Sequence, residues 1–130
     1  MTRELFYLAL VTLLTALLWV PYVLNRLQVW GLADTVGYPA DPKPLAPWAE
    51  RARKAHANAV ENLVLFATVV IVAHVLNKHT GASENAAAIY FWSRLVHVIA
   101  YIGAVPWLRT VAFVVGWLAC LDLIWHIFYA

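Results

Sequence analysis

The chain has 130 residues, of which 64% are hydrophobic and only 12% are charged. Ordinary soluble domains are about 45–50% hydrophobic and about 25% charged, so this composition excludes a protein that folds mainly in water. The formal net charge of +2 is too small for a nucleic-acid surface, and the single cysteine, Cys120, excludes an internal disulfide and a thiol-rich metal site.

The first apolar stretch predicts a membrane-spanning helix over residues 5–27. It follows Arg3 and lacks the small-residue cleavage pattern of a signal peptide, so we expect it to be retained. Pro21 has no backbone N–H to donate inside a helix, and it predicts a kink near the end of this span. Trp19 and Trp30 suit the membrane interface, where amphipathic rings collect.

The next segment is rich in glycine and proline. Residues 31–47 contain two glycines and four prolines, which predicts an ordered loop at the membrane surface. A second helix is expected over residues 48–77, beginning beside Pro47 because proline is favoured in a first turn. At 1.5 Å per residue this helix is ~45 Å long, which exceeds the ~30 Å hydrocarbon core, so its charged beginning should project beyond the lipid.

Two further helices complete the expected bundle. Lys78 to Glu84 predicts a short turn, and a third span follows over residues 85–103. Pro106 marks the next turn, and a fourth span covers residues 107–128. The sequence therefore predicts an all-α protein with a single transmembrane domain, residues 1–130, built as an integral membrane four-helix bundle.

Basic residues gather in the connections on one side of this bundle. The first loop and its flanks contain Arg26, Lys43, Arg51, Arg53 and Lys54, whereas the opposite side contains Arg3 and Lys78. Cytoplasmic loops carry the excess of lysine and arginine, so we expect both termini to be non-cytoplasmic. The expected location is a bacterial inner membrane.

Polar residues follow one face of each of two predicted spans. The spacing is i, i+4, i+7 for Lys54, Asn58 and Glu61, and i, i+3, i+7 for Arg94, His97 and Tyr101. An ionisable residue inside a span costs about 2.5–3.5 kcal/mol, so each one needs a partner or a function. The two stripes should meet in the cytoplasmic half of the membrane. Their similar depth predicts an ion pair between Glu61 and Arg94.

This polar cluster has two interpretations. In the first, the charges pair only to hold the helices together. In the second, the surplus of cations over carboxylates, to which Arg109 adds, binds an anionic ligand through several polar contacts. A small transporter is disfavoured because the polar groups are confined to one half of the membrane and form no continuous path across it.

The remaining polar residues favour structural explanations. Asp122 and His126 are spaced i, i+4 and predict a mutual pair on the last helix rather than a metal site. His74 stands alone on an apolar face and predicts packing or an interhelical hydrogen bond. A haem bundle needs two axial ligands at matching depth, and no histidine spacing here requires one. We therefore expect no metal.

Two segments carry a resemblance to a known family. The stretch Glu-Arg-Ala-Arg-Lys-Ala-His-Ala-Asn-Ala-Val-Glu-Asn, residues 50–62, resembles the signature of the membrane-associated proteins in eicosanoid and glutathione metabolism (MAPEG). The stretch Arg-Leu-Val-His-Val-Ile-Ala-Tyr, residues 94–101, resembles the third-helix motif of the microsomal glutathione transferases in that family. With Pro106, Arg109 and residues 113–117, the resemblance covers about the last two thirds of the chain.

The resemblance implies a homotrimer of four-helix protomers with glutathione bound between neighbouring subunits near the cytoplasmic face. The residues that it implies for glutathione binding are Arg26, Arg51, Lys54, Asn58, Glu61, Arg94, His97 and Tyr101. Lys54 stands where an arginine is usual, which keeps the charge but loses a bidentate fork. The implied catalytic residues are Arg109, which stabilises the glutathione sulfur as an anion, and Thr110, which keeps the hydroxyl of a serine found in relatives.

The expected function is that of a glutathione-dependent membrane transferase or peroxidase, which acts on lipophilic electrophiles by thiolate activation. Its expected partners are membrane lipids, a lipophilic small-molecule substrate and further copies of the chain. Prostaglandin-synthesising relatives have a tyrosine where this chain has Phe113, so that reaction is not expected. The alternative is a non-catalytic MAPEG-like membrane protein that binds a lipid or another small anion, or that serves as a subunit of a larger membrane complex.

Overall fold

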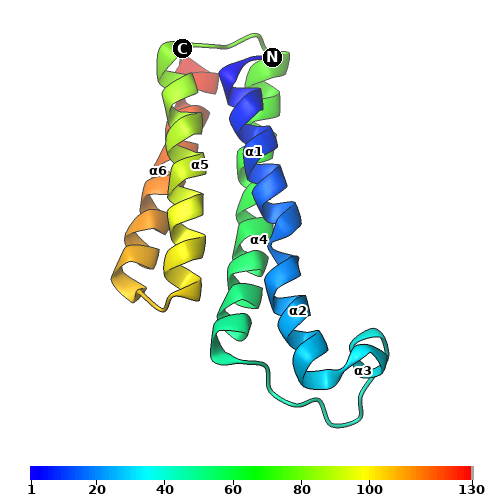
Figure 1. Ribbon diagram of the computed structural model, residues 1–130. Coiled ribbons are helices and arrows are strands. Elements are labelled where there is room, and N and C mark those ends of the chain that lie inside the picture. Colours follow the sequence, from blue (N-terminus) through cyan, green and yellow to red (C-terminus); the bar gives the residue numbers. More distant parts are fainter. Residues whose placement is uncertain (130) are drawn as a thin grey trace.

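The protein is a bundle of long helices, and the computed structural model describes residues 1–129. The helices are α1 (Arg3–Leu17), α2 (Trp19–Trp30), α3 (Leu32–Val36), α4 (Pro47–Val75), α5 (Gly81–Ile102) and α6 (Pro106–Tyr129). In Figure 1, α1 and α2 follow one another as a single rod beside α4, α5 and α6, and both ends of the chain lie at the same end of the bundle. The predicted all-α helical bundle is confirmed.

The first rod is interrupted at Leu18, between α1 and α2. Pro21 has no N–H to donate to the carbonyl of Leu17, four residues earlier, so the regular ladder of hydrogen bonds cannot continue there. The Leu18 N–H instead donates to the Thr15 carbonyl at 3.3 Å, which tightens the last turn of α1. The helix is therefore interrupted at Leu18, just before the proline from which a kink is predicted.

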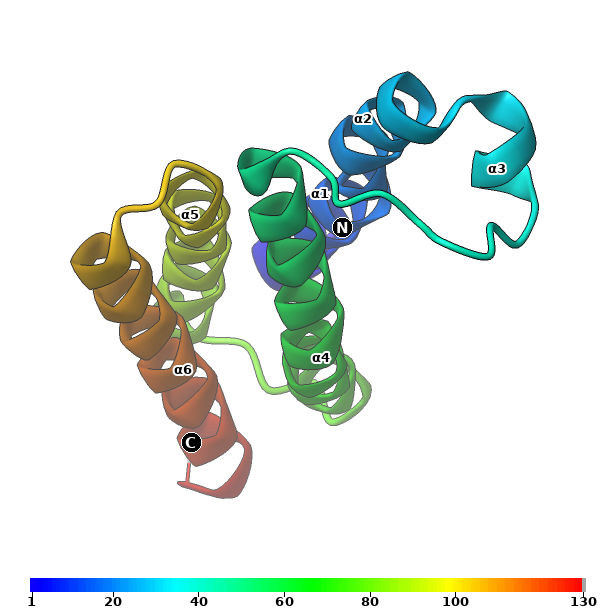
Figure 2. The same ribbon diagram turned by 90° about the horizontal axis from the view of Figure 1, so that it is seen from below.

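Three helical segments are long and apolar enough to cross a membrane: Arg3–Trp30, Pro47–Val75 and Pro106–Tyr129. The fourth rod, α5, is not among them because polar residues such as Arg94 and His97 interrupt its apolar sequence. It packs against α1, α4 and α6, and Figure 2 shows it between α6 and the other rods. Its polar groups are therefore enclosed by protein rather than facing outward, since Arg94 and His97 are both buried.

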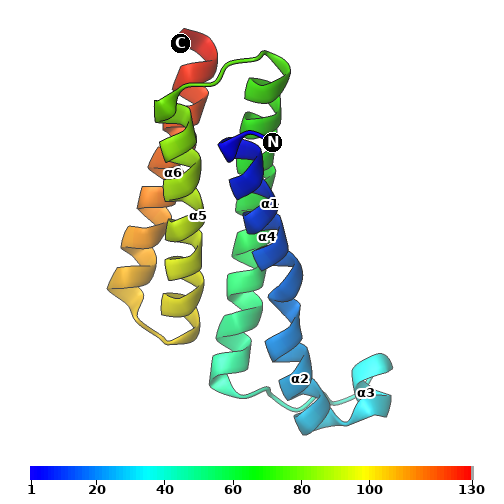
Figure 3. The same cartoon turned by 45° about the horizontal axis from the view of Figure 1, so that its top comes forward.

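The connection between α2 and α4 lies beyond one end of the bundle, as Figure 3 shows for α3. It contains the short helix α3, which the proline and glycine pattern did not predict. Two hydrogen bonds fasten the connection to α2: the Trp30 indole donates to the Lys43 carbonyl at 2.7 Å, and the Ala46 N–H donates to Asn25 Oδ1 at 3.0 Å. The loop is thus held at the mouth of the bundle.

Small residues let α5 and α6 approach closely. Gly116 on α6 faces Ser93 on α5, and a Cβ added to Gly116 would lie 2.8 Å from Ser93 Oγ. Ser93 Oγ donates to the Tyr90 carbonyl at 2.8 Å, and the Tyr90 ring stacks on Phe66 of α4 with centroids 3.9 Å apart. This contact joins α4, α5 and α6 at the centre of the bundle and fixes the positions of the polar residues further along α5.

A second polar contact fixes the far end of the bundle, where both termini lie. The buried carboxylate of Glu4 accepts a hydrogen bond from Ser83 Oγ at 2.6 Å, and His79 lies 3.4 Å from the same oxygen. Thr80 caps the start of α5 by accepting from the Ser83 N–H at 3.0 Å. The first helix is therefore joined to the beginning of α5 at the end opposite the α5–α6 turn.

Candidate functional site

A polar pocket of about 260 Å³ lies where α5 ends and α6 begins. Its lining residues come from three helices and are Asn58, His97, Tyr101, Arg109, Thr110 and Phe113. Five of these six were singled out from the sequence as site candidates, and the structure brings them around one cavity. Asn58 on α4 and His97 on α5 are 39 positions apart in the chain, and they meet at this pocket because α4 packs against α5.

The wall of the pocket formed by α4 is held by a chain of amides. Asn58 Oδ1 accepts a hydrogen bond from Nη2 of Arg94 at 2.6 Å, and Asn62 Nδ2 lies 3.3 Å from the same oxygen. Asn62 also donates to the Asn58 carbonyl at 2.8 Å. Because the amide oxygen of Asn58 is used by these donors, its NH₂ group is the part that remains available to a ligand.

Arg94 is a buried cation with a neutral partner. Its exposed fraction is only 3%, and its side-chain hydrogen bond goes to an amide rather than to a carboxylate. A buried charge is stable only when it is hydrogen-bonded and compensated. The positive charge behind Asn58 is therefore available to attract an anion to the pocket.

The opposite wall is aromatic and carries a second cation. The guanidinium carbon of Arg109 lies 5.0 Å from the centroid of the Tyr101 ring, within the range of a cation–π contact. The ring of His97 packs edge-on against Tyr101 at 5.6 Å and lies 6.1 Å from Phe113. These contacts orient Arg109 at the rim of the pocket, in the first turn of α6.

His97 contributes an unsatisfied polar atom to this wall. The residue is 2% exposed, and its Nδ1 has no hydrogen-bond partner among residues 1–129. Buried polar atoms without partners are rare and need an explanation, such as a ligand or a water molecule. The orphaned nitrogen lies in a residue that lines the pocket, so a polar ligand there is consistent with it.

The predicted ion pair between Glu61 and Arg94 is wrong. The ion pairs in the described part of the chain, residues 1–129, do not include it, and Glu61 is exposed. Three residues along an α-helix rotate the side chain by ~60° relative to Asn58, which carries Glu61 away from α5. Arg94 therefore meets Asn58 instead.

The other candidates do not line the pocket of a single protomer. Arg51 Nε donates to the carbonyl of Ile102 at 2.8 Å and so caps the end of α5. Lys54 is exposed on α4. Arg26 stacks over the ring of Trp30, with its guanidinium carbon 4.9 Å from the centroid. These three cations surround the same end of the bundle without facing the cavity.

Asp122, His126 and His74 were given structural explanations from the sequence, and their surroundings in the structure differ. Asp122 and His126 form the predicted i, i+4 pair, with His126 Nδ1 at 3.6 Å from Asp122 Oδ2 and 2.7 Å from the Asp122 carbonyl. His74 is exposed, and its ring lies 5.6 Å from that of His79. No group of three His, Cys, Asp or Glu side chains within residues 1–129 is arranged to hold a metal ion.

Sequence reasoning missed Asn62, which fixes the orientation of Asn58. The signal was present, because Asn62 follows Asn58 at the i+4 spacing that places two helical side chains together. It also missed the role of Gly116, whose missing side chain makes room for Ser93. Nothing in the local sequence distinguishes this glycine from one that merely faces lipid, since the close approach depends on the position of α5.

The fold and the pocket define an integral membrane protein of helical-bundle type, with a polar pocket at one end. The chain matches the model of the MAPEG family over residues 6–129, and it belongs to that family. Comparison with curated proteins gives no match. The resemblance seen in the last two thirds of the sequence is therefore confirmed, and the family match extends it through the first helix.

Proposed function

We propose that the protein is a glutathione-dependent membrane transferase or peroxidase acting on lipophilic electrophiles. The observation that carries the proposal is the gathering of Asn58, Arg109 and Thr110 around one pocket whose lining, within the described residues, contains no carboxylate. Glutathione carries two carboxylates and a thiol, so it needs several hydrogen-bond donors and a net positive environment. Membership of the MAPEG family, many of whose members use glutathione, supports this ligand.

The donors in the pocket suit an anionic tripeptide. The Asn58 NH₂ is free because Arg94 and Asn62 occupy its oxygen, and the charge of Arg94 lies directly behind it. Tyr101 and His97 add a phenol and a ring nitrogen to the wall formed by α5. In this proposal Asn58, Arg94, His97 and Tyr101 hold the tripeptide, whose binding positions the sulfur near α6.

Arg109 and Thr110 supply the chemistry in this proposal. A free thiol titrates near pH 8.5, so only a few per cent of it is nucleophilic at neutral pH. A guanidinium in the first turn of a helix stabilises a thiolate both by its charge and by hydrogen bonding, and the Thr110 hydroxyl donates to the same sulfur. The thiol proton leaves to solvent, the thiolate forms a carbon–sulfur bond with the electrophile, and the leaving group departs with the electron pair.

The exposed candidates support assembly into a homotrimer, with glutathione bound between subunits. Glu61 is exposed on α4 between apolar residues that are also exposed, Val60 at 47% and Val64 at 65%. A carboxylate facing hydrocarbon is costly, and a neighbouring copy that covers this face removes the cost. In the trimer, Glu61, Lys54, Arg26 and Arg51 lie near the pocket rim and complete the glutathione site.

The same proposal includes four membrane spans in a bacterial inner membrane. The 22 residues of α5 make a rod of ~33 Å, long enough to cross the ~30 Å hydrocarbon core while the other helices enclose its polar face. Lysine and arginine are concentrated at the pocket end of the bundle, which supports a cytoplasmic position for that end and a position on the other side for both termini. A lipophilic substrate then reaches the pocket from the bilayer.

A binding and spectroscopic experiment tests the proposal. Purified protein in detergent is titrated with glutathione while its melting temperature and the ultraviolet absorbance of the thiolate are recorded. We expect stabilisation by glutathione but not by free glycine or glutamate, a thiolate band at neutral pH, and conjugation of 1-chloro-2,4-dinitrobenzene. Binding without a thiolate band contradicts the catalytic proposal and favours the non-catalytic alternative. Absence of binding rejects glutathione as the ligand.

A further inference from the structure

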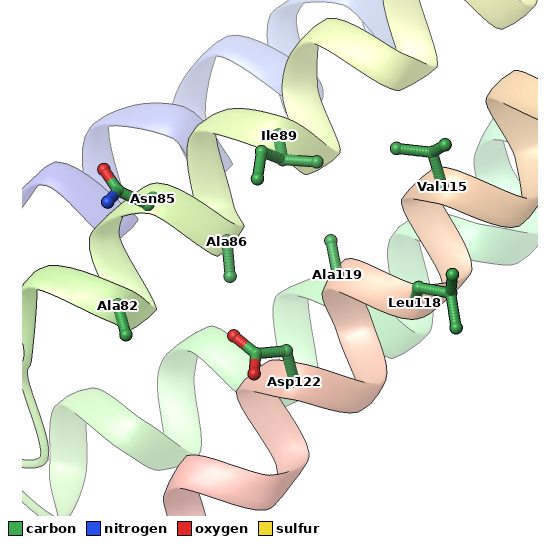
Figure 4. A pocket seen from close by; sticks show the side chains of 8 residues that line it. All are labelled: Ala82, Asn85, Ala86, Ile89, Val115, Leu118, Ala119 and Asp122. Carbon is green, nitrogen blue, oxygen red and sulfur yellow. The ribbon is translucent and has the colours of Figure 1, made fainter.

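A hollow of about 340 Å³ lies between α5 and α6 near the end of the bundle opposite the polar pocket. It exists because Ala82, Ala86 and Ala119 are too small to fill the space between the two helices, as Figure 4 shows. We call this hollow, together with a second hollow that continues from it along α5 and α6, the outer groove. All of its lining residues come from α5 and α6.

The outer groove continues along the two helices toward the α5–α6 turn. A second hollow of about 390 Å³ shares Ile89 and Val115 with the first and extends to Leu108. The distance along α6 from Leu108 to Asp122 is about four turns, or ~21 Å, which exceeds the ~15 Å half-thickness of the hydrocarbon core. Apart from Ser93, whose hydroxyl already donates to the Tyr90 carbonyl, the lining of this second hollow is apolar. The length of the outer groove and its largely apolar lining suit one lipid acyl chain.

The end of the outer groove that lies nearest the two chain termini carries the carboxylate of Asp122. Figure 4 shows the Asp122 side chain pointing into the space between α5 and α6, with Asn85 on the neighbouring turn of α5. The Asp122 side chain is 50% exposed, and His126 Nδ1 lies closer to the Asp122 backbone carbonyl (2.7 Å) than to its carboxylate (3.6 Å). A half-exposed carboxylate on a membrane helix is unfavourable unless a cation accompanies it.

We infer that the outer groove binds one phospholipid of the phosphatidylethanolamine class, with an acyl chain in the groove and the primary ammonium group of its head at Asp122. An ammonium group brings both a positive charge and N–H donors to the Asp122 carboxylate. Trp125, which is 60% exposed one turn further along α6, is placed for the headgroup region, where tryptophan collects. This inference is independent of glutathione binding.

Lipid competition followed by native mass spectrometry tests the inference. The protein is reconstituted with equal amounts of phosphatidylethanolamine, phosphatidylcholine and phosphatidylglycerol that carry identical acyl chains, and the lipids retained on each protomer are counted. We expect about tenfold preference for phosphatidylethanolamine over phosphatidylcholine, since the quaternary ammonium of phosphatidylcholine cannot donate a hydrogen bond. The anionic lipid should be retained least, because its charge has the same sign as that of Asp122.

Two variants and a control assign the preference to the outer groove. Asp122→Asn keeps the size of the side chain and should reduce the preference to less than about twofold, whereas Asp41→Asn, in the exposed loop, should leave it unchanged. Ala119→Leu fills the hollow and should lower retention of all three lipids. If Ala119→Leu does not fold, the result for Asp122→Asn decides whether the lipid preference arises at the outer groove.

Three results overturn the inference. One is equal retention of phosphatidylethanolamine and phosphatidylcholine by the unaltered protein, and another is an unchanged preference in Asp122→Asn. The third is disulfide cross-linking between two copies of a Leu118→Cys protein in which the buried Cys120 is replaced by alanine. Efficient cross-linking identifies a second copy of the chain, rather than a lipid, as the occupant of the groove.

Discussion

The guanidinium of Arg94 on α5 and the amide oxygen of Asn58 on α4 are 2.6 Å apart, and this hydrogen bond replaces the ion pair that the sequence predicts between Arg94 and Glu61. The first prediction follows from it. Asn58→Leu removes the acceptor of a buried cation and should destabilise the protein by about 1.5–3 kcal/mol. Asp41→Asn, in the exposed loop, should change stability by less than ~0.5 kcal/mol, as expected for a surface residue outside the proposed site and subunit interface. Unfolding midpoints in mixed detergent measure both effects, and equal losses in the two variants would contradict the assignment.

The charge of Arg94 can be separated from its structural role. Asn58→Asp keeps an oxygen for the guanidinium but adds a negative charge and removes the NH₂ group that faces the pocket. We expect this variant to keep or gain stability while its affinity for glutathione falls at least about tenfold, or ~1.4 kcal/mol. Calorimetric titration measures the affinity. Undiminished binding would show that neither the Asn58 amide nor the positive charge behind it contacts the ligand.

Arg109 should act on the sulfur more than on overall binding. Lowering the thiol pKa by about one to two units corresponds to ~1.4–2.7 kcal/mol of preference for the anion, and the bound thiol is then largely ionised at neutral pH. Arg109→Ala should therefore bind glutathione within several-fold of the unaltered protein, while the midpoint of the thiolate absorbance moves upward toward the ordinary thiol value.

Two further variants serve as controls for Arg109. Arg109→Lys keeps the charge but loses the fork, and it should give an intermediate midpoint. Arg53→Ala removes an exposed cation whose partner is Glu50, at 3.1 Å, and it should leave the midpoint unchanged. A thiolate band that persists unchanged in Arg109→Ala would assign sulfur activation to another residue.

Gly116 should be sensitive to the addition of a single methyl group. A Cβ there would lie 2.8 Å from Ser93 Oγ, so Gly116→Ala forces the hydroxyl to move and should cost about 1–3 kcal/mol. In a Ser93→Ala background the obstructing oxygen is absent. Gly116→Ala should then lower the stability by at least ~0.5 kcal/mol less than it does in the unaltered protein. Unfolding of the two single variants and the double variant measures this coupling. Strict additivity would mean that α6 does not pack on Ser93 in the membrane.

The orientation of the bundle is testable by labelling. Cysteines introduced near Met1 and near Pro42, in a protein that lacks Cys120, should react with an impermeant maleimide from opposite sides of the membrane. We expect labelling near Met1 in intact cells stripped of their outer membrane, and labelling near Pro42 only after permeabilisation. The reverse pattern would place the polar pocket on the outer side.

The sequence predicted five of the six residues that line the pocket, and for those on α4 and α5 the reason is helical spacing. Asn58 on α4 and His97 and Tyr101 on α5 lie on the inward faces of their helices, and Arg109 follows immediately after the turn. The partners of Arg94 and Arg51 could not be predicted in this way. They depend on the rotation and relative height of α4 and α5, which no periodicity within one helix specifies, and Arg51 contacts a backbone carbonyl that any residue would supply.

The hydrogen bond from Arg51 to the carbonyl of Ile102 bears on how the pocket admits a ligand. It joins α4 to the last turn of α5 at the rim, while the stacked rings of Phe66 and Tyr90 join the same two helices deeper in the bundle. Sliding of α4 along α5 would break both contacts at once. The two walls of the pocket therefore form a rigid, preassembled cup, and a ligand can enter it without separation of α4 from α5.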